Sequence, residues 1–262
     1  MKEFIIHCLR QNLSKQRIRK YELIFETCKK LKINLKKLRQ RDIDKFFFWL
    51  NSQNYKEWTK LTKWRCFKKI AKFYNKDLNF SSYRLKEPKT KIDILTKEEI
   101  FQLIAAARNF RDKLLILLLY ESGARISEIL NLKKEDLEFD EFGAILNLNG
   151  KTGQRKIRIV KAAEFLKVYY KALTSNKLFE LSEQRVNFML KYLARKCGIK
   201  KRIYPHLFRH TRATHLAKFL TEPELKIYFG WSNSSKMPAL YVHLSARDID
   251  EKIISLNQKI EI

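Results

Sequence analysis

The chain has 262 residues, enough for one large domain or two smaller ones and for a substantial hydrophobic core. Its 56 Lys and Arg against 28 Asp and Glu give a net charge of +28, a self-repelling excess that favours a polyanionic partner, with nucleic acid the leading candidate. The four cysteines are dispersed and suggest neither disulfides nor a zinc cluster, and no apolar run approaches the roughly 20 residues of a membrane-spanning helix. We therefore expect a reduced, cytoplasmic, nucleoid-associated protein with no membrane contact.

The first 87 residues contain neither glycine nor proline, which predicts helices joined by short polar turns. Apolar residues at spacings of three and four predict helices over 3–13, 16–31, 42–53 and 57–75. Residues 1–90 hold 25 basic and 8 acidic residues, so this part is the more basic one. Its aromatic residues are expected to pack in the core, and its cations to contact phosphates. The candidates for DNA contact are Lys63, Arg65 and Lys68.

A polar segment with one proline, YRLKEPKTKIDI, follows at residues 83–94 and predicts a linker over 88–95. We expect a helical, basic domain over 1–87 and a second domain over 96–262. The second domain is predicted to contain helices and one hairpin. The expected helices cover 97–108, 111–122, 161–173, 182–197, 206–218, 222–229, 235–243 and 246–257, and the hairpin strands cover 144–149 and 155–160.

Arg125 lies where one apolar helix is expected to stop at Gly123 and a short helix to begin. Its guanidinium is planar and permanently charged, which suits bidentate recognition of a phosphoryl group. Glu128 would then hold the guanidinium in place, although a purely structural Arg–Glu pair explains the same spacing.

Lys151 is expected at the tip of the hairpin, in NGKTGQRKIRIV. Most turn lysines are merely solvated, but a hairpin tip can also bring an ammonium to a leaving oxygen in a nucleic-acid groove. Lys156 and Arg158 share one strand face and would follow the DNA backbone.

The segment PHLFRHTRATHL places His206 and Arg209 three residues apart, on one face of a helix that starts at a proline. A neutral imidazole near a helix N-terminus can accept a proton. His210 and His215 are expected to lie off this face and to be structural. A zinc site on His206 and His210 is not favoured, since no third ligand is near, and we expect no metal or other cofactor.

Tyr241 follows the polar stretch GWSNSSKMP, which is suited to present it as a nucleophile. A phenol with an ordinary pKa near 10 needs a base or cationic surroundings to attack. A tyrosine packed in the core is the alternative reading of this position.

Together the motifs ARISEIL, GKTGQRKIRI, HLFRHTRATHL and GWSNSSKMPALYVHLS, in this order, resemble the tyrosine recombinase (phage integrase) family, and most of all its archaeal and Xer-like members. The resemblance covers residues 95–257. It implies a mainly helical fold with a small antiparallel sheet, in which a helical core-binding domain precedes a mixed α+β catalytic domain.

The resemblance also implies roles for individual residues. Arg125 and Arg209 would bind the scissile phosphate, and Lys151 would be the general acid for the 5′ oxygen. His206 would be the base-like partner, and Trp231, where many members have histidine, a packing or hydrogen-bonding brace. Tyr241 would form a 3′-phosphotyrosyl link.

As a whole, the family resemblance implies a site-specific recombinase or integrase that acts on double-stranded DNA. It also implies a homotetramer on DNA and a monomer or weak oligomer in the absence of DNA. Residues 249–262 would then pack against a neighbouring subunit, so deleting 250–262 should weaken recombination but spare strand cleavage. The alternatives are a type IB topoisomerase-like enzyme and a non-catalytic DNA-binding protein descended from an integrase. The DNA site, and whether the tyrosine acts in cis or in trans, are left open by the sequence.

Overall fold

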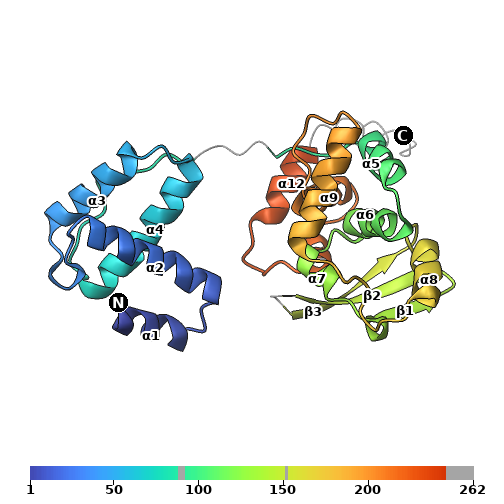
Figure 1. Cartoon of the computed structure of the whole chain (residues 1–262), viewed down its shortest axis with the longest axis horizontal. Helices are drawn as coiled ribbons and strands as arrows, with labels where there is room; N and C mark the ends of the chain where they lie inside the picture. Colours follow the sequence, from blue (N-terminus) through green and yellow to red (C-terminus); the bar gives the residue numbers. More distant parts are fainter. Residues whose placement is uncertain (88–91, 151–152, 246–262) are drawn as a thin grey trace, which may run out of the picture. The chain divides into compact units, whose positions relative to one another are not determined.

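The computed structural model describes residues 1–87, 92–150 and 153–245, with side chains described up to Val242 (Figure 1). The chain divides into two compact units, Met1–Lys91 and Ile92–Ile262, which we call the N-terminal and C-terminal units. Each has hydrophobic clusters of its own. Leu95, at the end of the linker expected from the sequence, is buried in the core of the C-terminal unit.

The N-terminal unit is built from helices around an aromatic core. The helices are α1 (Lys2–Arg10), α2 (Lys15–Lys30), α3 (Gln40–Ser52) and α4 (Glu57–Tyr74), with the short 3-10 helix η1 (Leu35–Lys37). Helix α4 packs against both α2 and α3. Phe46 and Phe67 stack at 3.9 Å between ring centroids in this core, and Trp64 is 5 % exposed beside them. The rings of Phe46, Trp64 and Phe67 are therefore in the core, as expected from the sequence, whereas Trp58, which was also expected there, is 43 % exposed.

Helix α6 (Phe110–Ser122) is the centre of the C-terminal unit. Its fully buried apolar residues are Leu114, Leu115, Ile116, Leu118 and Leu119. A helix that is apolar on all sides must be covered on all sides, and α6 contacts α5 (Lys97–Ala106), α8 (Ala163–Ala172), α10 (Pro205–Leu216) and one strand of the sheet. It ends at Gly123, which adopts the left-handed conformation with φ of 57°.

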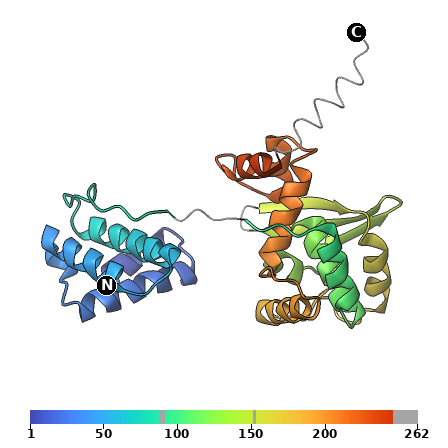
Figure 2. The ribbon, with the colours of Figure 1, turned by 90° about the horizontal axis from the view of Figure 1, so that it is seen from above.

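The sheet is three-stranded and antiparallel, in the order β1 (Leu137–Asp140), β2 (Gly143–Gly150) and β3 (Gly153–Ile159) (Figure 2). The register pairs Leu146 with both Leu137 and Ile157. The hairpin of β2 and β3 was expected from the sequence, whereas β1 was not. The sequence of β1, LEFD, is short and half polar, so it lacks the β-branched alternation that identified the hairpin.

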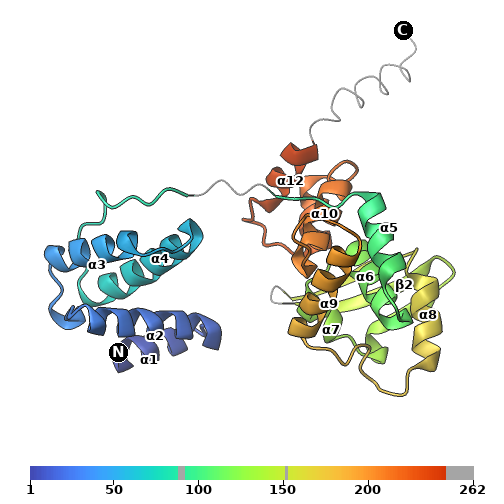
Figure 3. The ribbon, with the colours of Figure 1, turned by 45° about the horizontal axis from the view of Figure 1, so that its top comes forward.

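The remaining described elements are helices, of which two precede the sheet and three follow it. They are α7 (Ile126–Leu130), η2 (Lys134–Asp136), α9 (Glu183–Lys196), α11 (Glu222–Phe229) and α12 (Met237–Ser245). Helices α10, α11 and α12 contact one another, and Figure 3 shows α10 beside α12. They enclose a small apolar cluster that includes Phe229 and Tyr241. The expected helix over 246–257 lies outside the described residues. A mainly helical fold with a small antiparallel sheet is confirmed.

Candidate active site

Arg209 is a buried cation at the centre of the C-terminal unit. It is 2 % exposed, and its guanidinium donates to the carbonyl of Gly123 at 3.0 Å and to that of Phe229 at 2.6 Å. These carbonyls end α6 and α11, where the last carbonyls of a helix lack partners within the helix. The guanidinium carbon also lies 5.0 Å from the ring centroid of Phe229 and 5.5 Å from that of Trp231. Arg209 therefore has a fixed orientation, set by two helix ends and two aromatic rings.

Arg125 is held by a buried carboxylate at the start of α7. Its backbone N–H and one guanidinium nitrogen each donate to Glu128 at 2.8 Å. The same carboxylate accepts two bonds from Arg155 of β3, at 3.0 and 2.7 Å. Arg155, in turn, donates to the carbonyl of Tyr228 at 3.1 Å. The Glu128 carboxylate thus joins α7 to the hairpin and orients both arginines.

The pKa values show how strongly positive this region is. Burial would raise the pKa of Glu128, but the bonds from Arg155 and Arg125 outweigh it and lower the pKa to about 2. Burial, followed by repulsion from Arg125 and Arg155, lowers the pKa of Arg209 to about 9. Three guanidiniums therefore lie near one carboxylate, which is bonded to two of them, and an added anion would relieve the repulsion. A phosphate has the charge and the acceptor geometry for this place.

Tyr241 is buried beside Arg209. It is 1 % exposed, and its ring stacks on Trp231 with 5.5 Å between centroids and 4° between planes. Its hydroxyl lies 2.5 Å from Nδ1 of His210. Burial raises the pKa of Tyr241 to about 12, against the opposing effect of Arg209. In this arrangement Trp231 packs on both the tyrosine and the arginine.

The two histidines at the start of α10 differ in their contacts. His206 is solvent-exposed as a residue, although protein atoms crowd its ring. Desolvation, followed by the charges of His210 and Arg209, lowers its pKa to about 4. The expectation that His210 lies off the face of His206 is wrong, because residues i and i+4 of a helix are neighbours on its surface. Their rings lie 4.6 Å apart, edge to face.

The structure brings together Arg125, Glu128, His206, Arg209, Trp231 and Tyr241 within one region of the C-terminal unit. It adds Arg155 and His210, which sequence reasoning did not assign to the site. Lys151 lies outside the described residues, between Gly150 and Gly153 at the ends of β2 and β3. In the part of the chain that the structure describes, no three His, Cys, Asp or Glu side chains group as metal ligands.

The two candidates for DNA contact in the C-terminal unit are not part of this cluster. On β3, Lys156 and Arg158 form ion pairs with Glu138 and Asp140 of β1. Both cations remain substantially exposed, and these carboxylates compete with phosphates for them. In the N-terminal unit, Arg65 pairs with Glu87, and Lys63 and Lys68 lie over the rings of Tyr55 and Phe80.

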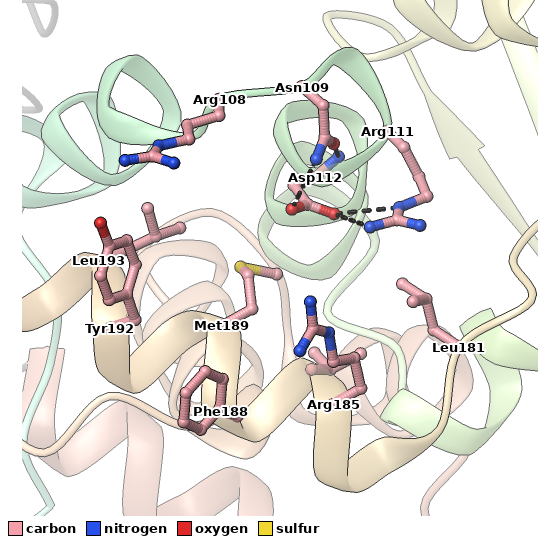
Figure 4. A pocket seen from close by; sticks show the side chains of 11 residues that line it. Arg108, Asn109, Arg111, Asp112, Leu181, Arg185, Phe188, Met189, Tyr192 and Leu193 are labelled. Atoms are coloured by element: carbon pink, nitrogen blue, oxygen red, sulfur yellow. Dashed lines mark hydrogen bonds and ion pairs between the residues drawn. The ribbon is translucent and has the colours of Figure 1, made fainter.

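A separate cavity of about 260 Å³ lies between the start of α6 and α9 (Figure 4). Arg108, Arg111 and Arg185 line it, and Arg111 is bound to Asp112. It lies at the end of α6 opposite Gly123, about 20 Å away at 1.5 Å per helical residue. It is therefore not part of the candidate active site.

A sequence model of the Phage integrase family matches residues 93–247, more than half of the chain. The chain is 34 % identical over 155 residues to the tyrosine recombinase XerA of Pyrococcus horikoshii, which is 53 % of each protein. The chain spans about half the length of the curated relatives it matches.

Two solved structures are similar to the model. One is the crystal structure of XerA recombinase, with a TM-score of 0.53 and 20 % identity over 100 % of this chain and 98 % of that one. The other is the Tn1549 transposon integrase in complex with transposon right end DNA, with a TM-score of 0.74 and 18 % identity over 97 % and 98 %. These likenesses establish a shared fold.

The C-terminal unit thus has the fold shared by these structures, and it brings Arg125, Arg209 and Tyr241 into one region. The chain belongs to the Phage integrase family. No helix in the described residues is long and apolar enough to cross a membrane.

Proposed function

We propose that the chain is a site-specific DNA recombinase that cleaves and rejoins strands through a 3′-phosphotyrosyl intermediate. The observation that carries the proposal is the grouping of Arg125, Arg209 and Tyr241. Two guanidiniums with fixed orientation can bind the non-bridging oxygens of one phosphate. The tyrosine hydroxyl is the nucleophile beside them, and Arg209 lowers its cost of ionisation.

The other residues complete the reaction. Glu128 and Arg155 keep Arg125 in place. His206 supplies a neutral imidazole next to both arginines, which can bind a phosphate oxygen or pass a proton. Trp231 limits the movement of the Tyr241 ring by stacking on it. Lys151 is assigned as the general acid that protonates the leaving 5′ oxygen, on the resemblance alone.

The partner in this proposal is double-stranded DNA, and the working assembly is a homotetramer on DNA. The net charge of +28 supports a polyanionic partner. The Tn1549 integrase was solved in complex with DNA, which supports the same class of substrate. Exchange between two duplexes requires four cleavages, and four copies of one nucleophile supply them.

The test uses a DNA substrate nicked close to a candidate site, so that the short fragment leaves after cleavage and traps the intermediate. Wild type and Tyr241→Phe are incubated with it in a chelator of divalent metals. A protein–DNA adduct that survives denaturant, formed by wild type and absent in Tyr241→Phe, is the expected result. If the protein binds DNA but forms no adduct on any substrate, including the attachment region of a mobile element that encodes it, the proposal is wrong and the chain is a non-catalytic DNA-binding protein.

Relaxation of a supercoiled plasmid that lacks the recombination site distinguishes a type IB topoisomerase-like enzyme from a recombinase. Relaxation of any supercoiled DNA at rates equal to those on the site would favour a type IB-like enzyme. A recombinase is expected to act on its own site and to form complexes of four protein copies on paired sites, measured by light scattering.

A further inference from the structure

The hydroxyl of Tyr241 contacts a histidine to which the family resemblance assigned no role. Nδ1 of His210 lies 2.5 Å from it, and no other hydrogen bond to this hydroxyl occurs among the described residues. Both side chains are shielded from water, since Tyr241 is 1 % exposed and His210 is half-buried. The contact joins α10 to α12 and comes on top of the stacking on Trp231.

The charges around His210 set the protonation of its ring. Burial, followed by the charge of Arg209, lowers the pKa of His210, so the ring is neutral at pH 7. The titratable and charged groups that contact it are His206 and Arg209 on its own helix and Tyr241 on α12. In the described part of the chain, no carboxylate contacts the ring to hold a second proton on it. A neutral ring has one nitrogen with a free lone pair, and in the tautomer with the proton on Nε2 the phenol donates its hydrogen to Nδ1.

His206 is less well placed for the same task. Its ring lies beside that of His210, yet no hydrogen bond between His206 and Tyr241 occurs in the described structure. It is exposed to solvent and close to Arg125 and Arg209, which is a position for contact with a phosphate. In the proposed reaction His210 thus contacts the tyrosine hydroxyl, and His206 is placed to contact the phosphate.

We propose that His210 is a catalytic residue that takes the proton of Tyr241 as the tyrosine attacks. The inference rests on the proposed function. The phenolic oxygen forms a bond to phosphorus, the bond from phosphorus to the 5′ oxygen breaks, and the phenolic proton moves to Nδ1 of His210. The leaving 5′ oxygen receives a separate proton from the general acid. In rejoining, the 5′ hydroxyl attacks and gives its proton back to the group that had been the general acid, while His210 returns its proton to the departing phenolate.

A base in contact is needed because the tyrosine is buried. Burial raises the pKa of Tyr241 to about 12, so it does not ionise unaided at neutral pH. A positioned general base contributes roughly 10²- to 10⁴-fold in rate. Arg209 next to the phenolate and the phosphate stabilises the charge that forms.

The test compares His210→Asn with His215→Asn. His215 is a matched control, because it is on the same helix, is half-buried, has a pKa lowered by burial, and has Nδ1 2.9 Å from the hydroxyl of Tyr120. Adduct formation is measured on the nicked DNA and on an oligonucleotide with a 3′-p-nitrophenyl phosphate, whose leaving group needs no general acid. His210→Asn is expected to be slower by roughly 10²-fold or more on both substrates. His215→Asn should keep its rate.

Lys151→Ala should show the opposite pattern: its rate of adduct formation should fall on the nicked DNA and recover on the nitrophenyl substrate. In His210→Gly, added imidazole should restore at least about tenfold of the lost rate, which a purely structural role would not produce. The role of His210 as proton acceptor would be wrong if His210→Asn formed the adduct as fast as His215→Asn. It would also be wrong if the rate of His210→Asn recovered on the nitrophenyl substrate. Absence of any adduct with wild type would instead overturn the proposed function.

Discussion

At the scale of single residues, the Glu128 carboxylate organises the cationic cluster. It is 4 % exposed and accepts bonds from the backbone and guanidinium of Arg125 and from both terminal nitrogens of Arg155. Gly150 lies directly over this group, since a Cβ there would meet Oε1 of Glu128 at 2.3 Å. One buried acid thus sets the position of two arginines and of the end of strand β2.

Arg155→Met should destabilise the fold by about 3 kcal/mol, because it leaves a buried carboxylate with one partner fewer. Denaturant unfolding measures the loss. Arg155→Lys should lie between wild type and Arg155→Met, since an ammonium cannot make the bidentate contact.

A double variant completes a double-mutant cycle for Glu128 and Arg155. Glu128→Gln combined with Arg155→Met should cost less than the sum of the single changes, because no charge is left buried without a partner. Additive costs would show that the two side chains do not stabilise each other.

At the scale of elements, the end of α6 joins the central helix to the site. Gly123 is left-handed, its carbonyl accepts a bond from Arg209, and a Cβ there would meet Phe229 at 2.6 Å. Glu121, two residues earlier, accepts bonds from the backbone N–H groups of residues 160–162 where α8 begins. The helix end therefore ties α8, α10 and α11 together.

Gly123→Ala should be more harmful than Gly198→Ala. Both glycines have φ near 60°, so both substitutions cost roughly 1 kcal/mol of backbone strain. A Cβ at Gly198 has no neighbour within 4 Å, whereas one at Gly123 displaces Phe229 and the carbonyl that orients Arg209. Thermal unfolding and adduct formation should both fall further for Gly123→Ala, and equal losses would contradict the role of this contact.

At the scale of the whole molecule, charge and protonation set the behaviour in solution. The excess of 56 basic over 28 acidic residues predicts binding to DNA that weakens steeply with salt. The slope of log affinity against log salt, measured by fluorescence anisotropy on site and non-site DNA, should be about −0.9 for each phosphate neutralised. A slope near zero would exclude the phosphate backbone as the main contact.

The histidines make stability depend on pH. The pKa of His206 is lowered to about 4, and burial also lowers those of His210 and His215. An unfolded histidine titrates near 6.5, so between pH 6.5 and 4 the unfolded chain binds more protons. The free energy of unfolding should therefore fall as pH falls through this window. His206→Asn and His215→Asn should each flatten the decline, which urea unfolding at pH 7 and pH 4.5 would measure.

Local patterns in the sequence determined much of this protein. Apolar spacing and the positions of glycine and proline predicted the helices from α1 to α12 and the hairpin, because these signals act over a few residues. The resemblance assigned Arg125, Arg209 and Tyr241 to one site. Strand β1 was missed, since LEFD has too few residues to show a period.

Only the tertiary structure decided which side chains meet across distant segments. Arg155 reaches Glu128 from another element, 27 residues along the chain, and His210 meets Tyr241 31 residues away. Neither contact leaves a periodic or local signal in the sequence. Both depend on helices and strands being packed together, which buries the charges and hydroxyls and so requires each to find a partner.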